Sequence, residues 1–259
     1  MADMMDSELK ELLDGLFDKY DNTALIADDP VSVPHMFTGR EDREIAGFLA
    51  STIAWGNRKA IVKNGRRMMD FLDGVPYEFT MNASDEELRA LERFVHRTFN
   101  GRDFRDFILA LRRMYRERGG IGGFFEERYA ATGDIRVALS DFRREFFACD
   151  HQPRCEKHVS SIDKKASCKR LNMYLRWMVR DDGRGVDFGL WKTIPASALY
   201  LPLDVHSGNM SRALGLLSRT QNDWKAVEEV TAALRRFDAD DPVKYDFALF
   251  GAGIDGYLD

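Results

Sequence analysis

The stretch Ser167–Arg180, SCKRLNMYLRWMVR, places a lysine where a helix is predicted to begin. Lys165, Arg170 and the positive N-terminal end of the helix all disfavour the ammonium form of Lys169, and partial burial acts in the same direction. A neutral lysine amine is the nucleophile that forms Schiff bases. Lys169 is therefore a candidate catalytic residue.

The same helix also has a purely structural interpretation. One face is apolar and predicted to be buried, and consists of Cys168, Leu171, Leu175 and Met178. The other face is basic, and consists of Lys169, Met173, Arg176 and Arg180. A basic face of this kind is usually solvated, so composition alone favours an ordinary surface helix.

A carboxylate occupies a helix start in Leu201–Leu217, LPLDVHSGNMSRALGLL. Asp204 precedes an apolar stripe at helical spacing, which predicts that it is the N-cap residue. A carboxylate at this position stays ionised, and it can stabilise a cation or orient a water molecule. Capping alone is the simpler hypothesis.

Cysteine and histidine residues gather before the lysine, at Cys149, His151, Cys155 and His158. They could in principle bind zinc, but their spacing matches no established ligand pattern. Three cysteines in the chain are too few for a four-thiolate iron–sulfur cluster. We expect no metal and no cofactor, with zinc at these residues left open.

The elements that position these residues are predicted to be helices. Apolar residues recur at helical spacing in Glu44–Trp55, Arg58–Leu72, Asp85–Phe99, Asp103–Arg118, Asp134–Ala148, Ser167–Arg180, Val205–Leu217, Trp224–Phe237 and Pro242–Phe250. Strand-like alternation is nearly absent. We predict an all-α protein of about nine to eleven helices with short connections.

Composition and charge narrow the class of protein. The 259 residues are 44% hydrophobic and 31% charged, which is typical of an ordered globular chain. No apolar run is long enough to span a membrane, and the acidic, amphipathic N-terminus does not resemble a secretory signal. Three cysteines fit a reducing compartment. We expect a cytoplasmic protein with no membrane contact.

The net charge of −5 hides an uneven distribution. Residues 1–44 carry a net charge of −8 and residues 237–259 carry −5, whereas residues 45–69 carry +5 and residues 151–180 carry +6. If the two basic segments share a face, they form a surface for a polyanion. If they point apart, they are solvated helix faces.

Two short motifs resemble the helix-hairpin-helix DNA glycosylase superfamily: Lys169-Arg170-Leu171-Asn172-Met173 and, later, Leu203-Asp204-Val205-His206. In that superfamily a lysine opens the helix after the hairpin and an aspartate follows in V-D-x-H. The resemblance implies that Lys169 and Asp204 are the catalytic pair. Lys164 and Lys165 are rival lysines, but only Lys169 has the matching K-x-x-N register.

A second resemblance covers nearly the whole chain. Four stretches are similar to a bacterial family named domain of unknown function 2400: DPVSVPHMFTGREDREIAGFLASTIAWGNRKAI, CKRLNMYLRWMVR, PLDVHSGNMSRALGLL and DPVKYDFALFGAGI. The chain departs from glycosylase hairpins, because HVSSIDKKASCKR lacks the glycines that let backbone amides approach a phosphate. The 35-residue interval from Lys169 to Asp204 is closest to the archaeal 8-oxoguanine glycosylase branch.

The glycosylase resemblance also implies residues that contact DNA. Trp55 would stack on a base extruded from the duplex, and Asn57 would hydrogen-bond the edge of that base or the DNA. A tryptophan at a helix end is more often a core or rim residue. Tyr245 and Asp246 would form the opposite pocket wall. The remaining expected DNA contacts are Arg58, Lys59, Lys165, Arg170, Arg176 and His206.

The combined expectation is a monomeric, helix-hairpin-helix glycosylase-like unit over residues 1–259. Two helical lobes, 45–165 and 1–44 plus 166–259, would leave a cleft between them. The expected activity is removal of a damaged base, such as an oxidised one, from duplex DNA, with or without strand cleavage. The alternative is a nucleic-acid-binding or adaptor protein that keeps the scaffold without the chemistry.

Overall fold

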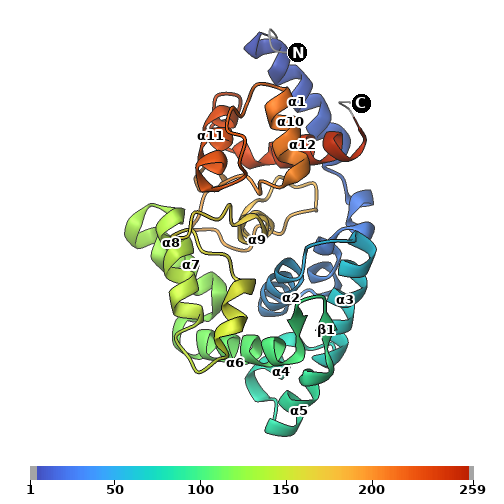
Figure 1. Ribbon diagram of the computed structural model, residues 1–259, viewed down its shortest axis with the longest axis vertical. Coiled ribbons are helices and arrows are strands. Elements are labelled where there is room, and N and C mark those ends of the chain that lie inside the picture. Colours follow the sequence, from blue (N-terminus) through green and yellow to red (C-terminus); the bar gives the residue numbers. More distant parts are fainter. Residues whose placement is uncertain (1–4, 257–259) are drawn as a thin grey trace. The chain divides into compact units, whose positions relative to one another are not determined.

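The computed structural model describes residues 5–256, and their structure is predominantly helical (Figure 1). The α-helices are α1 (Asp6–Tyr20), α2 (Arg40–Thr52), α3 (Arg58–Phe71), α4 (Pro76–Asn82), α5 (Asp85–Ala90), α6 (Gly101–Arg118), α7 (Gly120–Thr132), α8 (Ile135–Phe146), α9 (Lys169–Val179), α10 (Val205–Ala213), α11 (Trp224–Arg235) and α12 (Tyr245–Ile254). The prediction of an all-α fold is confirmed. Among the described residues, none of the helices is long and apolar enough to cross a membrane.

The chain divides into two compact units. Unit 1 combines residues 1–25 with residues 161–259, and unit 2 consists of residues 26–160. Unit 2 is therefore inserted, in sequence, between the two segments that build unit 1. Lys169 and Asp204 belong to unit 1, whereas Trp55 and Asn57 belong to unit 2.

Helix α2 forms the centre of unit 2. Its residues Glu44–Thr52 are all buried, and the helix packs against α3, α4 and α7. The Phe48 ring lies in a cluster of aromatic side chains from α6 and α8, where it contacts Phe107, Phe142 and Phe146. Edge-to-face and offset ring pairs of this kind add to the stabilisation from apolar burial.

The helix expected over Asp85–Phe99 is wrong in its second half. Helix α5 ends at Ala90, a short 3₁₀ turn follows at Leu91–Arg93, and the chain then forms a hairpin of β1 (Val95–His96) and β2 (Phe99–Asn100). The strands are antiparallel, with His96 opposite Phe99. The hairpin returns Phe99 to the same aromatic cluster as Phe94, so tertiary packing overrides the helical periodicity.

Unit 1 is built around α9. Residues Leu171–Val179 are buried on every side of this helix, so it is a core helix. The segment after it returns along its C-terminal end, where the backbone amides of Phe188 and Trp191 donate to the Trp177 and Met178 carbonyls at 2.8 and 3.0 Å. Helix α12 packs against both α1 and α10.

Three helices were not expected as separate elements, namely α1, α4 and α7. Helix α7 follows α6 directly because Gly119, at φ 68°, ends α6 in the left-handed conformation that glycine adopts without strain. Gly119 therefore joins the two helices directly, with no longer loop between them.

Candidate active site

Lys169 is the first residue of α9, as the sequence predicts. The turn before it contains Lys165 and Cys168, both with positive φ (63° and 50°), a backbone region that costs non-glycine residues free energy. The Lys165 carbonyl accepts a hydrogen bond from the Trp224 amide at 3.0 Å, and Ala166 bridges to Asp223. These bonds to the start of α11 fix the chain on its way into α9.

Asp204 is the N-cap of α10, again as predicted. Its Oδ1 accepts hydrogen bonds from the Ser207 amide at 3.0 Å and the Ser207 hydroxyl at 3.1 Å. The Ser207 hydroxyl in turn accepts a bond from the Asp204 amide at 2.9 Å, which completes a capping box. The Asp204 carbonyl accepts from Asn222 at 2.7 Å. The carboxylate is therefore held in one orientation.

The two candidate residues lie side by side at the N-terminal ends of two helices. Lys169 Nζ is 4.0 Å from Asp204 Oδ2, the oxygen that the cap leaves unused. The two side chains are 26% and 21% exposed, so both are accessible from solvent while most of their surface is covered. Met173 Sδ lies 3.5 Å from Lys169 Nζ, one turn further along α9. The arrangement offers an amine, a fixed carboxylate and access for a substrate.

A buried ion pair continues the site along α9. Arg176 lies two turns after Lys169 and donates to Asp246 of α12, and its Nε is 3.4 Å from Asp187 Oδ1. The Arg176 guanidinium also stands over the Phe247 ring at 4.1 Å. Burial raises the pKa of Asp246 to about 6 against the pull of Arg176, and the charges of Asp204 and Lys169 act on it as well.

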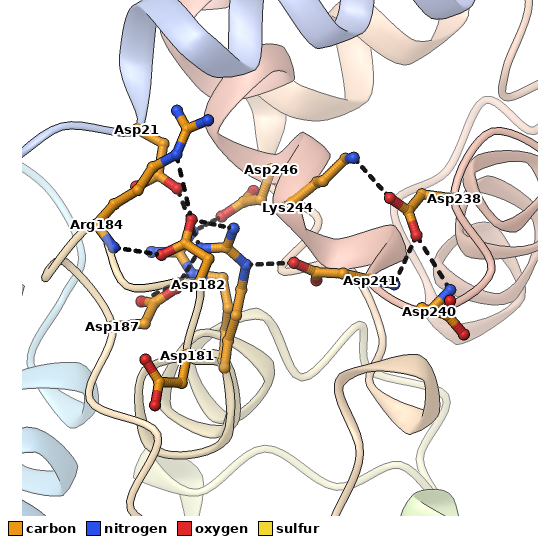
Figure 2. Close-up of polar contacts among 12 residues, drawn as sticks. Asp21, Asp181, Asp182, Arg184, Asp187, Asp238, Asp240, Asp241, Lys244 and Asp246 are labelled. Atoms are coloured by element: carbon orange, nitrogen blue, oxygen red, sulfur yellow. Dashed lines mark hydrogen bonds and ion pairs between the residues drawn. The ribbon is translucent and has the colours of Figure 1, made fainter.

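Arg180 is the C-cap residue of α9 and lies on the same face of the helix as Arg176. Its guanidinium is surrounded by carboxylates. It bonds Asp241 at 2.7 Å, Asp182 at 2.8 Å, Asp187 at 3.1 Å and Asp21 at 3.2 Å. The Arg180 side chain is only 1% exposed. Figure 2 shows these carboxylates gathered from the end of α1, the segment after α9 and the segment before α12.

The prediction that this helix has a solvated basic face is therefore wrong. Arg176 and Arg180 are buried, and aspartates from the acidic chain ends neutralise them inside unit 1. Desolvating a guanidinium is costly unless carboxylates pair with it, and here they do. Arg176 is consequently not placed to bind a phosphate, in contrast to the expectation that it contacts DNA.

Carboxylates outnumber arginines in this cluster. Arg176, Arg180 and Arg184 face five aspartates: Asp21, Asp182, Asp187, Asp241 and Asp246. The excess negative charge favours proton uptake. Burial raises the pKa of Asp21 to about 7, and the adjacent Asp182 carboxylate adds to that rise.

The other residues expected at the site differ in how far they are exposed. Lys164 and Lys165 are exposed in the turn before α9. Arg170 is half-buried, and burial lowers its pKa to about 10, so it stays charged at neutral pH. His206 is exposed on α10, with its ring against Phe250 at 6.1 Å.

Tyr245 does not line an open pocket. It is fully buried, and its hydroxyl donates to Asp14 of α1 at 2.9 Å. Burial and the Asp14 carboxylate both raise the pKa of this hydroxyl. Its role in the structure is to join α12 to α1, which corrects the expectation that it forms a pocket wall.

The expected pocket residues of unit 2 surround the turn between α2 and α3. Trp55 is half-buried, stacked on His158 at 6.1 Å and edge-on to His96 at 5.3 Å, which is the packing of a rim residue. Asn57 caps α3 by accepting from the Ala60 amide at 3.0 Å. Arg58 is half-buried and Lys59 is exposed.

The cysteine and histidine residues of unit 2 are engaged separately. His158 bonds the buried Asp103 carboxylate at 3.1 Å, and His151 bonds the Cys149 carbonyl at 2.7 Å. Cys155 is fully buried, and burial raises the pKa of its thiol. Across residues 5–256, no three acidic, histidine or cysteine side chains are arranged to hold a metal ion.

The aspartates around Arg176 and Arg180 were missed as a group by sequence reasoning. The signal was the charge distribution itself, because the acidic segments 1–44 and 237–259 complement the basic segment 151–180. Opposite charges that are distant in sequence tend to pair when the basic side chains become buried.

The described residues thus define a helical protein of two compact units, one of which carries a lysine–aspartate pair at two helix N-termini. Residues 29–255 match the family described as Protein of unknown function (DUF2400), and the chain belongs to that family. No curated protein and no solved structure matches the chain.

Proposed function

We propose that the protein is a DNA glycosylase that removes a damaged base through a lysine nucleophile. The observation that carries the proposal is the 4.0 Å separation of Lys169 Nζ and Asp204 Oδ2, although the two residues are 35 positions apart in sequence. Their resemblance to the catalytic pair of helix-hairpin-helix glycosylases supports the same assignment. Two residues can take part in the same reaction only if they lie together at one site.

In the proposed reaction the neutral Lys169 amine attacks C1′ of the damaged nucleotide. The bond from C1′ to the base breaks, and the base leaves with the bonding electrons and takes up a proton. Asp204 stabilises the positive charge that develops on the sugar. Loss of the amine proton and opening of the sugar ring give an imine at Lys169 Nζ.

The imine can then follow either of two courses. Water can add to it and release Lys169 with an abasic sugar. Alternatively, loss of a proton from C2′ expels the 3′ phosphate by β-elimination and cleaves the strand. No step in either course uses a redox cofactor, since electrons are conserved within the substrate.

Borohydride trapping tests the proposed function. Reduction of the imine should link the parent protein covalently to duplex DNA carrying an oxidised, deaminated or alkylated base, and Lys169→Gln should trap none. Lys164→Gln is the matched control, because it removes a nearby exposed lysine and should trap as the parent does. Trapping by no variant on any lesion would favour a non-catalytic binding protein.

The charge of Asp204 is tested separately from its cap. Asp204→Asn keeps a side-chain oxygen for the Ser207 amide but removes the negative charge beside Lys169. We expect turnover to fall by roughly two powers of ten or more while DNA binding is kept. Full activity in Asp204→Asn would show that the residue is only a helix cap.

A further inference from the structure

Unit 2 carries a basic surface that the proposed chemistry does not use. Four cations are exposed on one side of α3: Lys59, Lys63, Arg66 and Arg67. Their spacing of four, three and one residues keeps them on neighbouring turns of the helix. The rest of the helix surface is buried through Ile61, Val62, Met68 and Met69. We call the four cations the α3 stripe.

The stripe is not neutralised by the rest of the described chain. Lys59, Lys63 and Arg66 form no ion pair with any residue in 5–256. Arg67 is held by two aromatic rings, with its guanidinium 5.4 Å from Phe71 and 5.5 Å from Phe94. By contrast, aspartates neutralise the charges of Arg176 and Arg180 inside unit 1.

A hollow of about 540 Å³ opens beside the stripe. It is lined by Ala27, Asp28, Lys59, Val62, Lys63, Arg66, Arg67 and Asp70. Four cations and two carboxylates give this lining a net positive charge. The carboxylates of Asp28 and Asp70 repel an anion, so an anionic ligand would follow the line of the four cations.

We propose that the α3 stripe and its hollow bind the phosphodiester backbone of duplex DNA. The stripe runs roughly 12 Å along the helix, which corresponds to roughly three or four phosphates of one strand. Two of its members are arginines, whose planar guanidinium groups bond phosphate oxygens in pairs. The choice of DNA rests on the proposed function, whereas the anion site rests on the charges and the hollow.

The composition of the surface argues against two other partners. No large apolar side chain of α3 is exposed, so the stripe lacks the apolar anchors of a membrane-binding helix. Aromatic and apolar side chains, which protein interfaces favour at their centre, are missing from its exposed positions for the same reason. Charge alone is the signature of backbone binding to a nucleic acid.

Arg97 extends the basic surface at the N-terminal end of α3. It occupies the tip of the β1–β2 hairpin with φ 54°, and its guanidinium covers Gly56, the residue before Asn57. Gly56 has φ 95°, a backbone conformation that glycine adopts without strain, and the Arg97 guanidinium fills the space where a Cβ would stand. The hairpin thereby adds another cation next to the start of the helix.

Fluorescence anisotropy with a labelled, lesion-free duplex tests the inference. The parent should bind with an affinity that falls steeply with salt, because phosphate contacts release counterions. The triple variant Lys59→Glu/Lys63→Glu/Arg66→Glu should lose at least about 30-fold in affinity at low salt and reduce the log–log salt slope by roughly three. All three positions are exposed, and circular dichroism should show an unchanged fold.

The matched control reverses three other exposed arginines of unit 2, as Arg89→Glu/Arg93→Glu/Arg116→Glu. It makes the same change in net charge and should stay within about threefold of the parent. Equal losses of duplex affinity in the two variants would show that net charge, and not the α3 stripe, determines binding. That result would overturn the inference. Failure of the parent to bind duplex, with binding to vesicles of anionic phospholipid instead, would overturn it too.

This experiment separates the inference from the proposed function. Stripe-dependent binding without any borohydride trapping would contradict the glycosylase proposal alone. Trapping with parent-like binding by the stripe variant would contradict this inference alone.

Discussion

At the scale of single residues, the two oxygens of Asp204 have different tasks. Oδ1 caps α10 through Ser207, and Oδ2 faces Lys169 at 4.0 Å. Capping and chemistry are therefore compatible roles for one carboxylate. The cap fixes the orientation of the charge without consuming the oxygen that a reaction would use.

The cap makes a measurable contribution to stability. Asp204→Ala removes the bonds to the Ser207 amide and hydroxyl and should lower the free energy of unfolding by about 1 kcal/mol. Asp204→Asn should lower it by less, since the amide oxygen still accepts the N–H bond. Urea unfolding monitored by circular dichroism measures both. A greater loss in the asparagine variant would contradict the assigned cap.

Asp21 should make stability depend on pH. Burial raises its pKa from 3.8 to about 7, so the folded protein binds a proton that the unfolded chain releases. The stabilisation is fully present below about pH 4 and is lost as the pH rises through about 7, at about 1.4 kcal/mol for each unit of pKa difference. Asp21→Asn should flatten the free energy of unfolding between pH 5 and pH 8.

The control for this measurement is Asp18→Asn, in the last turn of α1, the helix that Asp21 follows as C-cap. Asp18 is 67% exposed and pairs with Arg184 at the surface. This variant should keep the parent's decline in stability toward high pH. An unchanged decline in Asp21→Asn as well would show that another group, such as Asp246, controls it.

At the scale of elements, α9 is held by charge as well as by apolar packing. Arg180→Ala would leave the carboxylates of Asp21, Asp182, Asp187 and Asp241 without their shared cation. We expect a loss of about 3–5 kcal/mol at pH 8, because uncompensated buried charges are strongly destabilising. Thermal or urea unfolding checks the value.

Arg184→Ala is the comparison for Arg180→Ala. Arg184 is 36% exposed, and it pairs with Asp18 and Asp182 near the surface. Its removal should cost at most about 1 kcal/mol, as for other exposed pairs. Similar losses in the two variants would contradict the view that burial gives the Arg180 cluster its strength.

Periodicity predicted the elements better than it predicted their surroundings. Apolar spacing located α9 within two residues at each end, yet it assigned Arg176 and Arg180 to water because it cannot detect carboxylates brought in from elsewhere in the sequence. In the region after α5, the spacing of Leu88, Leu91 and Phe94 is helical, but the hairpin buries Phe94 as well. Tertiary contacts decide such cases.

Local sequence patterns predicted the parts of the candidate site, whereas the pairing of Lys169 with Asp204 was expected only from the glycosylase resemblance. The helix-start positions of Lys169 and Asp204 follow from local capping and periodicity. Their proximity depends on the 35-residue interval between them, whose path along α9 has no local signature in the sequence. No local signal in the sequence predicts the Asp246–Arg176 pair either, because its two residues are also far apart along the chain.

At the scale of the whole molecule, the order of the chain couples the two units. Unit 1 is made from both ends of the chain, and unit 2 connects them. When unit 2 unfolds, unit 1 must close a flexible loop of 135 residues, which costs on the order of 4 kcal/mol. Unit 2 has no such dependence, because it is continuous in sequence.

Thiol labelling should reveal this asymmetry. Cys155 of unit 2 and Cys168 of unit 1 are both buried, so each reports the opening of its own unit. Phe107→Ala in the unit 2 core should accelerate labelling of both cysteines, whereas Arg180→Ala should accelerate that of Cys168 alone. Acceleration of Cys155 alone by Phe107→Ala would contradict the coupling.

Charge is also divided between the units. Residues 26–160 contain 22 acidic and 22 basic residues, so the net charge of −5 belongs to unit 1. Aspartates of the acidic ends pair with the buried arginines of unit 1, whereas the α3 stripe remains exposed on unit 2. An acidic protein is thereby compatible with a polyanionic partner.

The most direct test of the central claim is to map the borohydride-reduced adduct by mass spectrometry after digestion. We expect one modified residue, Lys169, carrying the reduced sugar remnant in a one-to-one complex. An adduct on Lys164 or Lys165 would keep the reaction class but contradict the assigned site. The absence of any adduct with every lesion offered, from a protein that still binds DNA, would contradict the catalytic claim itself.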